Sequence, residues 1–100
     1  MLQTYKIWEG ERTFLPGDDT SKYTVIEIVA EDIGWFIELP DEGLLGKTYS
    51  VYRTESEIIV HVVQEAGLGD PSYGSIHRYR DLSEAAADGF EQALKEMRLL

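Results

Sequence analysis

Along this chain, apolar and polar residues follow a strand-like pattern first and a helical pattern only at the end. Short runs rich in β-branched and aromatic residues alternate with clusters of Gly, Pro, Asp and Ser, a pattern typical of strands joined by turns. The runs predict strands at residues 2–9, 22–30, 35–39, 47–54, 57–64 and 73–80, with a short extension of the sheet at 13–15.

The run at 22–30 predicts a central strand. Its apolar character is nearly continuous, as in strands that are covered on both faces. Glu27 is the one charged residue inside it, so this carboxylate lies at an edge, pairs with a base or has a functional role. We favour pairing with a base such as Arg53 or Arg78.

The connections between runs predict two hairpins. The acidic connection Glu31–Gly34 predicts a hairpin with an acidic tip between the runs that flank it. The short connection Glu55-Ser56 predicts a second hairpin between the runs 47–54 and 57–64.

The C-terminal residues predict one amphipathic helix that begins after Asp81. Asp81 is a good N-cap, and Glu84 stands where a capping box places its acid. Glu91 and Lys95 form a favourable i,i+4 pair. Gly89 neighbours the apolar stripe, so we expect the helix backbone to approach the sheet closely there. The stripe consists of Leu82, Ala86, Phe90, Ala93, Met97 and Leu100.

Strands gathered first and a helix last predict an α+β fold, in a single domain over residues 1–100. We expect a mainly antiparallel sheet of about five to six strands packed against one C-terminal amphipathic helix. The helix should cover one face of the sheet. The other face is then partly wet, covered by the loop at 10–21, or used in an interface.

The composition narrows the classes of function. The chain has 100 residues and no cysteine, which excludes disulfides, thiolate nucleophiles and cysteine-based zinc sites. No apolar run approaches the ~20 residues needed to span a bilayer, and the first residues lack the pattern of a signal peptide. We therefore expect a cytoplasmic protein.

The net charge of -10, from 19 acidic and 9 basic residues, bears on the choice of partner. It disfavours direct contact with nucleic acid and with anionic membranes, since both are polyanions. It favours a protein partner with a basic surface. An acidic host proteome or cation binding would also explain the charge, and many of the acids fall at turns, where they make local hydrogen bonds.

The motifs indicate no catalytic, metal or cofactor site. The sequence has no G-x-S-x-G elbow, calcium loop or phosphate-binding loop, so we expect no cofactor and no metal and assign no catalytic residue. We expect His61 to be a core-edge histidine satisfied by one hydrogen bond, and His77 to be an exposed strand residue. The functional alternative for either is a general base or, for His61, a pH switch.

Aromatic residues exceed what a small core behind one helix needs, and Tyr and Trp often anchor protein interfaces. A platform for stacked bases is disfavoured, because the basic groove that should accompany it is missing. Acidic turns and exposed aromatics together define the expected contact surface. The predicted partner-binding residues are Asp18, Asp19, Glu31, Asp32, Trp35, Asp41, Glu42 and Tyr52.

Two pieces of the sequence resemble the HicB-type antitoxin family. Residues 23–43 read as a hairpin followed by Pro-x-x-Gly, and residues 82–94 begin Leu-Ser-Glu-Ala and end Ala-Leu. In that family the Pro-Gly turn leads almost directly into the Glu-Ala helix, whereas further predicted strands intervene here. No function is carried over from the resemblance.

Three hypotheses of function follow. The first is a small acidic non-catalytic domain, an inhibitor or antagonist that occludes a basic surface on a protein partner, for example a nucleic-acid-binding or defence protein, by presenting charge as a polyanion does. The second is a small hydrolase-like enzyme, or a subunit of one, that uses a His and carboxylate pair. The third is a housekeeping domain whose acidity reflects its host. An exposed sheet face or edge would also allow a homodimer.

Overall fold

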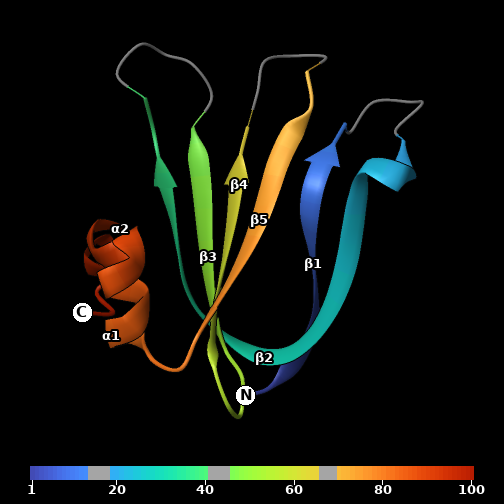
Figure 1. Ribbon diagram of the computed structural model, residues 1–100. Coiled ribbons are helices and arrows are strands. Elements are labelled where there is room, and N and C mark those ends of the chain that lie inside the picture. Colours follow the sequence, from blue (N-terminus) through green and yellow to red (C-terminus); the bar gives the residue numbers. More distant parts are fainter. Residues whose placement is uncertain (14–18, 41–45, 66–69) are drawn as a thin grey trace.

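Five antiparallel strands follow one another around a barrel, and a broken helix packs against its outside (Figure 1). The structure is a computed structural model that describes residues 1–13, 19–40, 46–65 and 70–100. The strands are β1 (Gln3–Arg12), β2 (Tyr23–Glu38), β3 (Lys47–Arg53), β4 (Ile58–Gln64) and β5 (Ser72–Tyr79). The helical segments are η1 (Thr20–Lys22), α1 (Leu82–Ala85), η2 (Ala86–Phe90) and α2 (Glu91–Glu96).

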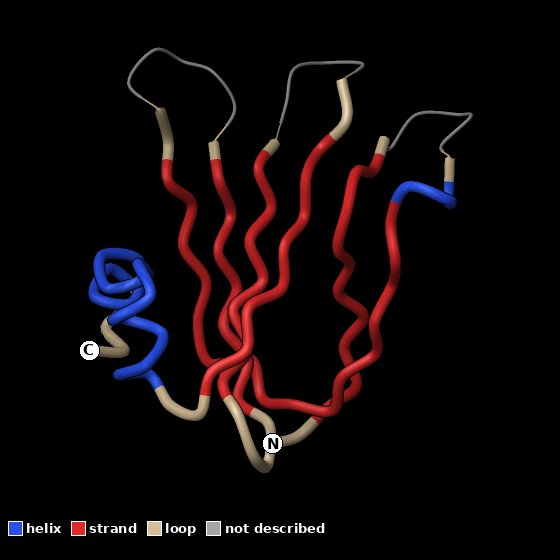
Figure 2. The backbone as a smooth tube through the Cα atoms, in the orientation of Figure 1, coloured by secondary structure: helices blue, strands red, loops and turns tan. Residues whose placement is uncertain are grey.

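Each strand pairs with the next, and β1 closes the barrel by pairing with β5. That closing pair is short, because only residues 10–12 of β1 meet residues 72–74 of β5. The N-terminus and the turn between β3 and β4 lie at one end of the barrel (Figure 2). The sequence predicted an α+β fold with an antiparallel sheet and a C-terminal helix, which is confirmed, but it did not predict that the sheet closes.

The strand β2 is long and changes partner at its middle. Residues 23–30, which we call the first half, pair with β1, and residues 31–38, the second half, pair with β3. A β-bulge at Ile33 separates the halves. Figure 1 shows the strand sweeping across one end of the barrel as it passes from one partner to the other.

The predicted hairpin at Glu31–Gly34 is therefore wrong. The Asp32 carboxylate accepts a hydrogen bond from the Gly34 backbone N–H at 3.2 Å, so the segment does contain a local irregularity. The chain bends there instead of reversing, because each half finds a different strand to pair with. The second predicted hairpin, β3 with β4, is confirmed.

The barrel interior holds a small apolar cluster. The side chains of Ile7 on β1, Ile28 and Ala30 on β2, and Ile59 on β4 are buried together. Tyr5 and Tyr52 pack against this cluster with their ring centroids 5.0 Å apart. Because alternate residues of a strand point to opposite faces, the neighbours of these residues face outward.

A second cluster lies between the outside of the sheet and the helix. Its buried residues are Val51, Ile58, Val60 and Tyr79 on the strands, with Ala85 and Leu94 on the helix. Phe90 packs over Tyr79 and Tyr49 with ring-centroid distances of 6.1 and 6.0 Å. The strands β3, β4 and β5 thus contribute residues to both clusters, one inside the barrel and one beneath the helix.

The helix begins as predicted but is not continuous. The Asp81 carboxylate accepts a hydrogen bond from the Glu84 backbone N–H at 2.8 Å, and Lys95 pairs with Glu91 at 2.9 Å. Gly89 has a φ of 109° and breaks the helix at that point. The expected close approach of Gly89 to the sheet is wrong, because a Cβ there would have nothing within 4 Å. Glycine is needed for its positive φ instead.

The expectation that the run at 22–30 is covered on both faces is also wrong. Val25 and Val29 are exposed on the outer face of β2, since the helix covers other strands. Glu27 is exposed opposite Lys6 of β1, so it does not pair with Arg53 or Arg78. Arg78 pairs with Glu57 instead. No helix among the described residues is long and apolar enough to cross a membrane.

Candidate protein interface

The second half of β2 has one edge that no described strand covers. Its other edge pairs with β3 from Glu31 to Glu38. On the uncovered side, β1 pairs only with the first half, and no other backbone hydrogen bond to residues 31–38 is found in the described part of the chain. This edge therefore exposes N–H and C=O groups that can accept a further strand.

The bulge at Ile33 decides which side chains face the barrel interior. Before the bulge, the even-numbered residues Ile28 and Ala30 point inward. One extra residue reverses the alternation, so after it Trp35 takes the inward side, opposite Ser50 of β3. Ile37, opposite Thr48, follows on the same side.

These inward-facing side chains are nevertheless exposed. Trp35 is 64% exposed and Ile37 46%, and Leu39 just beyond the strand is exposed as well. The interior cluster that buries Ile28 and Ala30 of the first half includes Ile7 of β1, whereas β1 does not pair along the second half. By contrast Trp8 of β1 is only 8% exposed. Trp35, Ile37 and Leu39 thus form a row of large apolar side chains beside an open strand edge, which we call the apolar row.

The opposite face of the second half is held by the end of the helical region. A Cβ on Gly34 would lie 3.1 Å from the Met97 sulfur and 3.3 Å from Leu99 Cδ1, so glycine permits their close approach. Further along, the ring of Phe36 stacks on Tyr49 with centroids 6.2 Å apart. The second half is therefore fixed in place from one face while the other face and one edge stay open.

Acidic residues stand at both ends of this segment. Glu31 pairs with the N-terminal amine at 3.7 Å, and Asp32 follows it. At the far end, Glu38 accepts a hydrogen bond from the Tyr49 hydroxyl at 3.1 Å. Burial, and next the contact with Glu38, raises the pKa of Tyr49. The residues between these acids, 33–37, carry no charge.

The structure brings three of the predicted partner-binding residues together on this segment: Glu31, Asp32 and Trp35. Tyr52 lies half-buried against the interior cluster, where burial and next the charge of Asp32 raise its pKa. Asp19 lies apart from them, beside η1. Its pKa is lowered by hydrogen bonds from the side chain and backbone of Ser21. Asp18, Asp41 and Glu42 lie outside the described residues.

Three residues of this surface were not singled out from the sequence: Ile37, Glu38 and Leu39. Ile37 alternates with Trp35, so it was foreseeable that the two share a face. Their exposure was not foreseeable, because it depends on the pairing of β1 with β2 stopping at Ala30.

No protein-family model, curated protein or solved structure matches this chain. Its function therefore has to be argued from its own surface.

The histidines were the candidates for catalysis. His61 is buried, at 7% exposed, and its Nε2–H donates to the Trp8 carbonyl at 2.8 Å, which confirms the expected single hydrogen bond. Burial lowers its pKa, and the bond to Trp8 opposes that shift. The expectation for His77 is wrong, since it is half-buried beneath Phe90, with ring centroids 5.1 Å apart.

His77 also contacts a hydroxyl. Its Nε2 lies 2.9 Å from Ser75 Oγ. A nucleophilic pair of this kind needs a third group to orient the histidine, and no carboxylate of the described residues is hydrogen-bonded to either histidine ring. The nearby Asp88 accepts from the Tyr79 hydroxyl instead, and burial first and then this bond raise the pKa of Tyr79.

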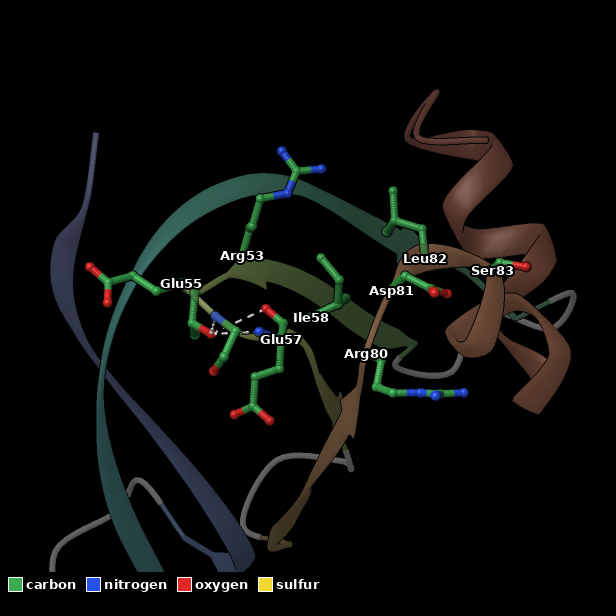
Figure 3. Close-up of a pocket in the computed structure, with 10 residues that line it drawn as sticks. Arg53, Glu55, Glu57, Ile58, Arg80, Asp81, Leu82 and Ser83 are labelled. Atoms are coloured by element: carbon green, nitrogen blue, oxygen red, sulfur yellow. Dashed lines mark hydrogen bonds between the residues drawn. The ribbon is translucent and has the colours of Figure 1, made fainter.

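A groove with a volume of about 490 Å³ lies between the β3–β4 turn and the start of α1 (Figure 3). Its charged side chains already serve the fold, because Arg80 pairs with Glu84 at 2.8 Å and Asp81 caps the helix. In Figure 3 the side chains of Arg53, Glu55 and Arg80 point in different directions, so they do not converge on one ligand. Neither histidine lines it, and no described residues gather as metal ligands.

Proposed function

We propose that this protein is a non-catalytic binding domain that covers a basic surface on a protein partner. The observation that carries the proposal is the apolar row of Trp35, Ile37 and Leu39, exposed beside an open strand edge on a segment that also carries Glu31, Asp32 and Glu38. Exposed Trp and large aliphatic residues at such a place are typical of the centre of a protein interface.

The charge supports a basic partner. The chain carries -10 overall, so a polyanion or an acidic protein is repelled and a basic protein is attracted over long range. In this arrangement the apolar row supplies contact area, and the acids at its ends set the choice of partner and the rate of association. The protein then acts by occlusion, because the surface that it covers is lost to other polyanions such as nucleic acid.

The proposal is tested by capture from an extract of the native host. Wild-type protein should retain a partner with a basic surface, identified by mass spectrometry, and the double variant Trp35→Ala, Ile37→Ser should not. The matched control is Val25→Ser with Val29→Ser, which removes two exposed apolar side chains from the first half of β2 and should retain the partner.

Binding of the purified partner is then measured at increasing salt. Affinity should fall by about tenfold or more between low and high ionic strength, because exposed charges are screened. A partner that keeps its affinity in high salt, or that binds the double variant as well as the wild type, would contradict the proposed function.

A further inference from the structure

We propose that the partner contributes an extended basic segment that adds to the open edge of the second half of β2 as a further strand. The inference rests on the proposed function and specifies its mode: backbone pairing along residues 34–38, with side chains of the segment lying on the apolar row. The added segment has apolar residues at every second position and a Lys or Arg at each end.

In the described part of the chain, the backbone of residues 34–38 is free along one edge to pair with a further strand. Unpaired strand edges are usually blocked by charges, proline or bulges, since they otherwise accept foreign strands. Here the bulge at Ile33 and the acids Asp32 and Glu38 stand at the ends of the segment, and the residues between them are left unblocked. An added strand of about four or five residues fits this interval and gains backbone hydrogen bonds along it.

The side chains of an added strand would lie against the apolar row. In an added strand, alternate residues lie on the face of Trp35 and Ile37, next to them across the new pair. Trp35 is 64% exposed, and apolar residues at those positions would shield its side chain from water. On the other face the segment meets the side of β2 that Met97 and Leu99 already cover near Gly34.

The acidic residues at the ends of the segment favour a basic partner over a second copy of this chain. A second copy of this chain would place Asp32 and Glu38 of one molecule close to the same acids of the other, and each molecule carries -10. A basic segment instead places a cation beside acids at each end of the interval, which also fixes its register. The acidic flanks thus favour a basic strand over self-association.

The first half of β2 provides an internal comparison. It too pairs along one edge only, with β1. Its centre, however, carries the exposed Glu27, a charge in the position where native edges are commonly protected. Addition of a strand is therefore expected at the second half and not at the first.

The test uses the full-length protein and synthetic peptides. The probe is acetyl-Lys-Val-Thr-Val-Thr-Val-Lys-amide, compared with the same peptide bearing Glu at both ends and with a version whose alternate backbone nitrogens are methylated. Binding should shift the emission of Trp35 to shorter wavelength, whereas the buried Trp8 contributes a constant background. Amide hydrogen exchange should slow at residues 34–38 and stay unchanged at residues 23–30.

The variants sharpen the test. Trp35→Ala should weaken binding of the basic peptide by about tenfold or more, since exposed tryptophans at interfaces contribute strongly. Glu38→Gln should weaken it a few-fold, and Glu27→Gln, which removes the same charge from the first half, should leave it unchanged. Unchanged urea midpoints of all three variants show that the fold is kept.

Each other outcome overturns the inference in a distinct way. Binding of the methylated peptide at equal strength, or protection confined to residues 23–30, removes strand addition at this edge while the proposed function stands. Concentration-dependent protection of residues 34–38 without peptide assigns the edge to a second copy. Absence of binding by the basic peptide, together with capture of a basic partner that depends on Trp35, again rejects only the strand mode. If the basic peptide does not bind and no basic partner is captured in a Trp35-dependent way, the proposed function is rejected as well.

Discussion

The two halves of β2 belong to one strand yet have different roles. The first half contributes Ile28 and Ala30 to the buried interior of the barrel, and β1 pairs with it throughout. The second half contributes no fully buried residue, and its inward-facing Trp35 and Ile37 are exposed. Both halves are rich in β-branched or aromatic residues, so hydrophobicity alone does not separate them.

What separates the halves is the partner that covers each face. The first half is covered from inside by β1 and β4, whereas the second half is covered from outside by Met97 and Leu99. The bulge at Ile33 makes this exchange of faces feasible within one strand, because a single extra residue reverses the alternation. A strand of this kind anchors the fold at one end and presents a surface at the other.

The largest effect should come from the same truncation made in each half. Ile28→Ala should lower the free energy of unfolding by about 2–5 kcal/mol, because it leaves a cavity in the interior cluster. Ile37→Ala, at a side chain 46% exposed, should cost less than about 1 kcal/mol. Urea unfolding of both variants measures the difference, and equal costs would contradict the division of roles.

A smaller effect should follow from crowding the contact that holds the second half to the helical region. Gly34→Val should destabilise the fold by about 1–3 kcal/mol, because the added atoms meet Met97 and Leu99. Gly34→Ala should cost less, since both neighbours are ends of side chains that can move. The double variant Gly34→Val with Met97→Ala should recover part of the loss, and strictly additive costs would argue against this contact.

The smallest effect is a dependence of the free energy of unfolding on pH, which arises from the buried His61. Burial lowers the pKa of His61 below its ordinary value of about 6.5, so the folded protein favours the neutral ring more than the unfolded chain does. The unfolded state therefore binds the proton first, and stability is lost as the pH falls below that value. Stability should be largest above it.

His61→Gln provides the control for this prediction, because Gln keeps a donor for the Trp8 carbonyl but does not titrate. Urea midpoints measured at about pH 8 and pH 5 should fall further for the wild type than for the variant. An equal fall in both proteins would assign the pH dependence to the carboxylates instead.

The sequence located most of the strands and the start of the helix, because those features are local. β-Branched runs marked the strands, and Asp81 with Glu84 marked the cap. The Glu31–Gly34 segment marked an irregularity, but whether it becomes a turn or a bulge depends on β1 and β3, which lie elsewhere in the chain. Gly89 likewise signalled a special position without showing whether close packing or a positive φ requires it.

Only individual residues of the candidate site, and not their arrangement, were predictable from the sequence. Trp35, Glu31 and Asp32 were identified from the sequence as contact residues, and the structure places them on one segment. The open edge beside them was not predictable, because it follows from the point along β2, after Ala30, at which the pairing with β1 stops. Pairings of this kind join residues that are distant in sequence, and no local pattern encodes them.

The contact of Gly34 with Met97 and Leu99 also has a consequence for the order of folding. It joins β2 to residues that follow all five strands in the chain, so its loop-closure cost is high and we expect it to form late. Weakening it should then speed unfolding more than it slows folding. Until the helical region docks, the second half of β2 is held by β3 alone. A partner strand present during folding would therefore meet this edge before the rest of the protein has closed around it.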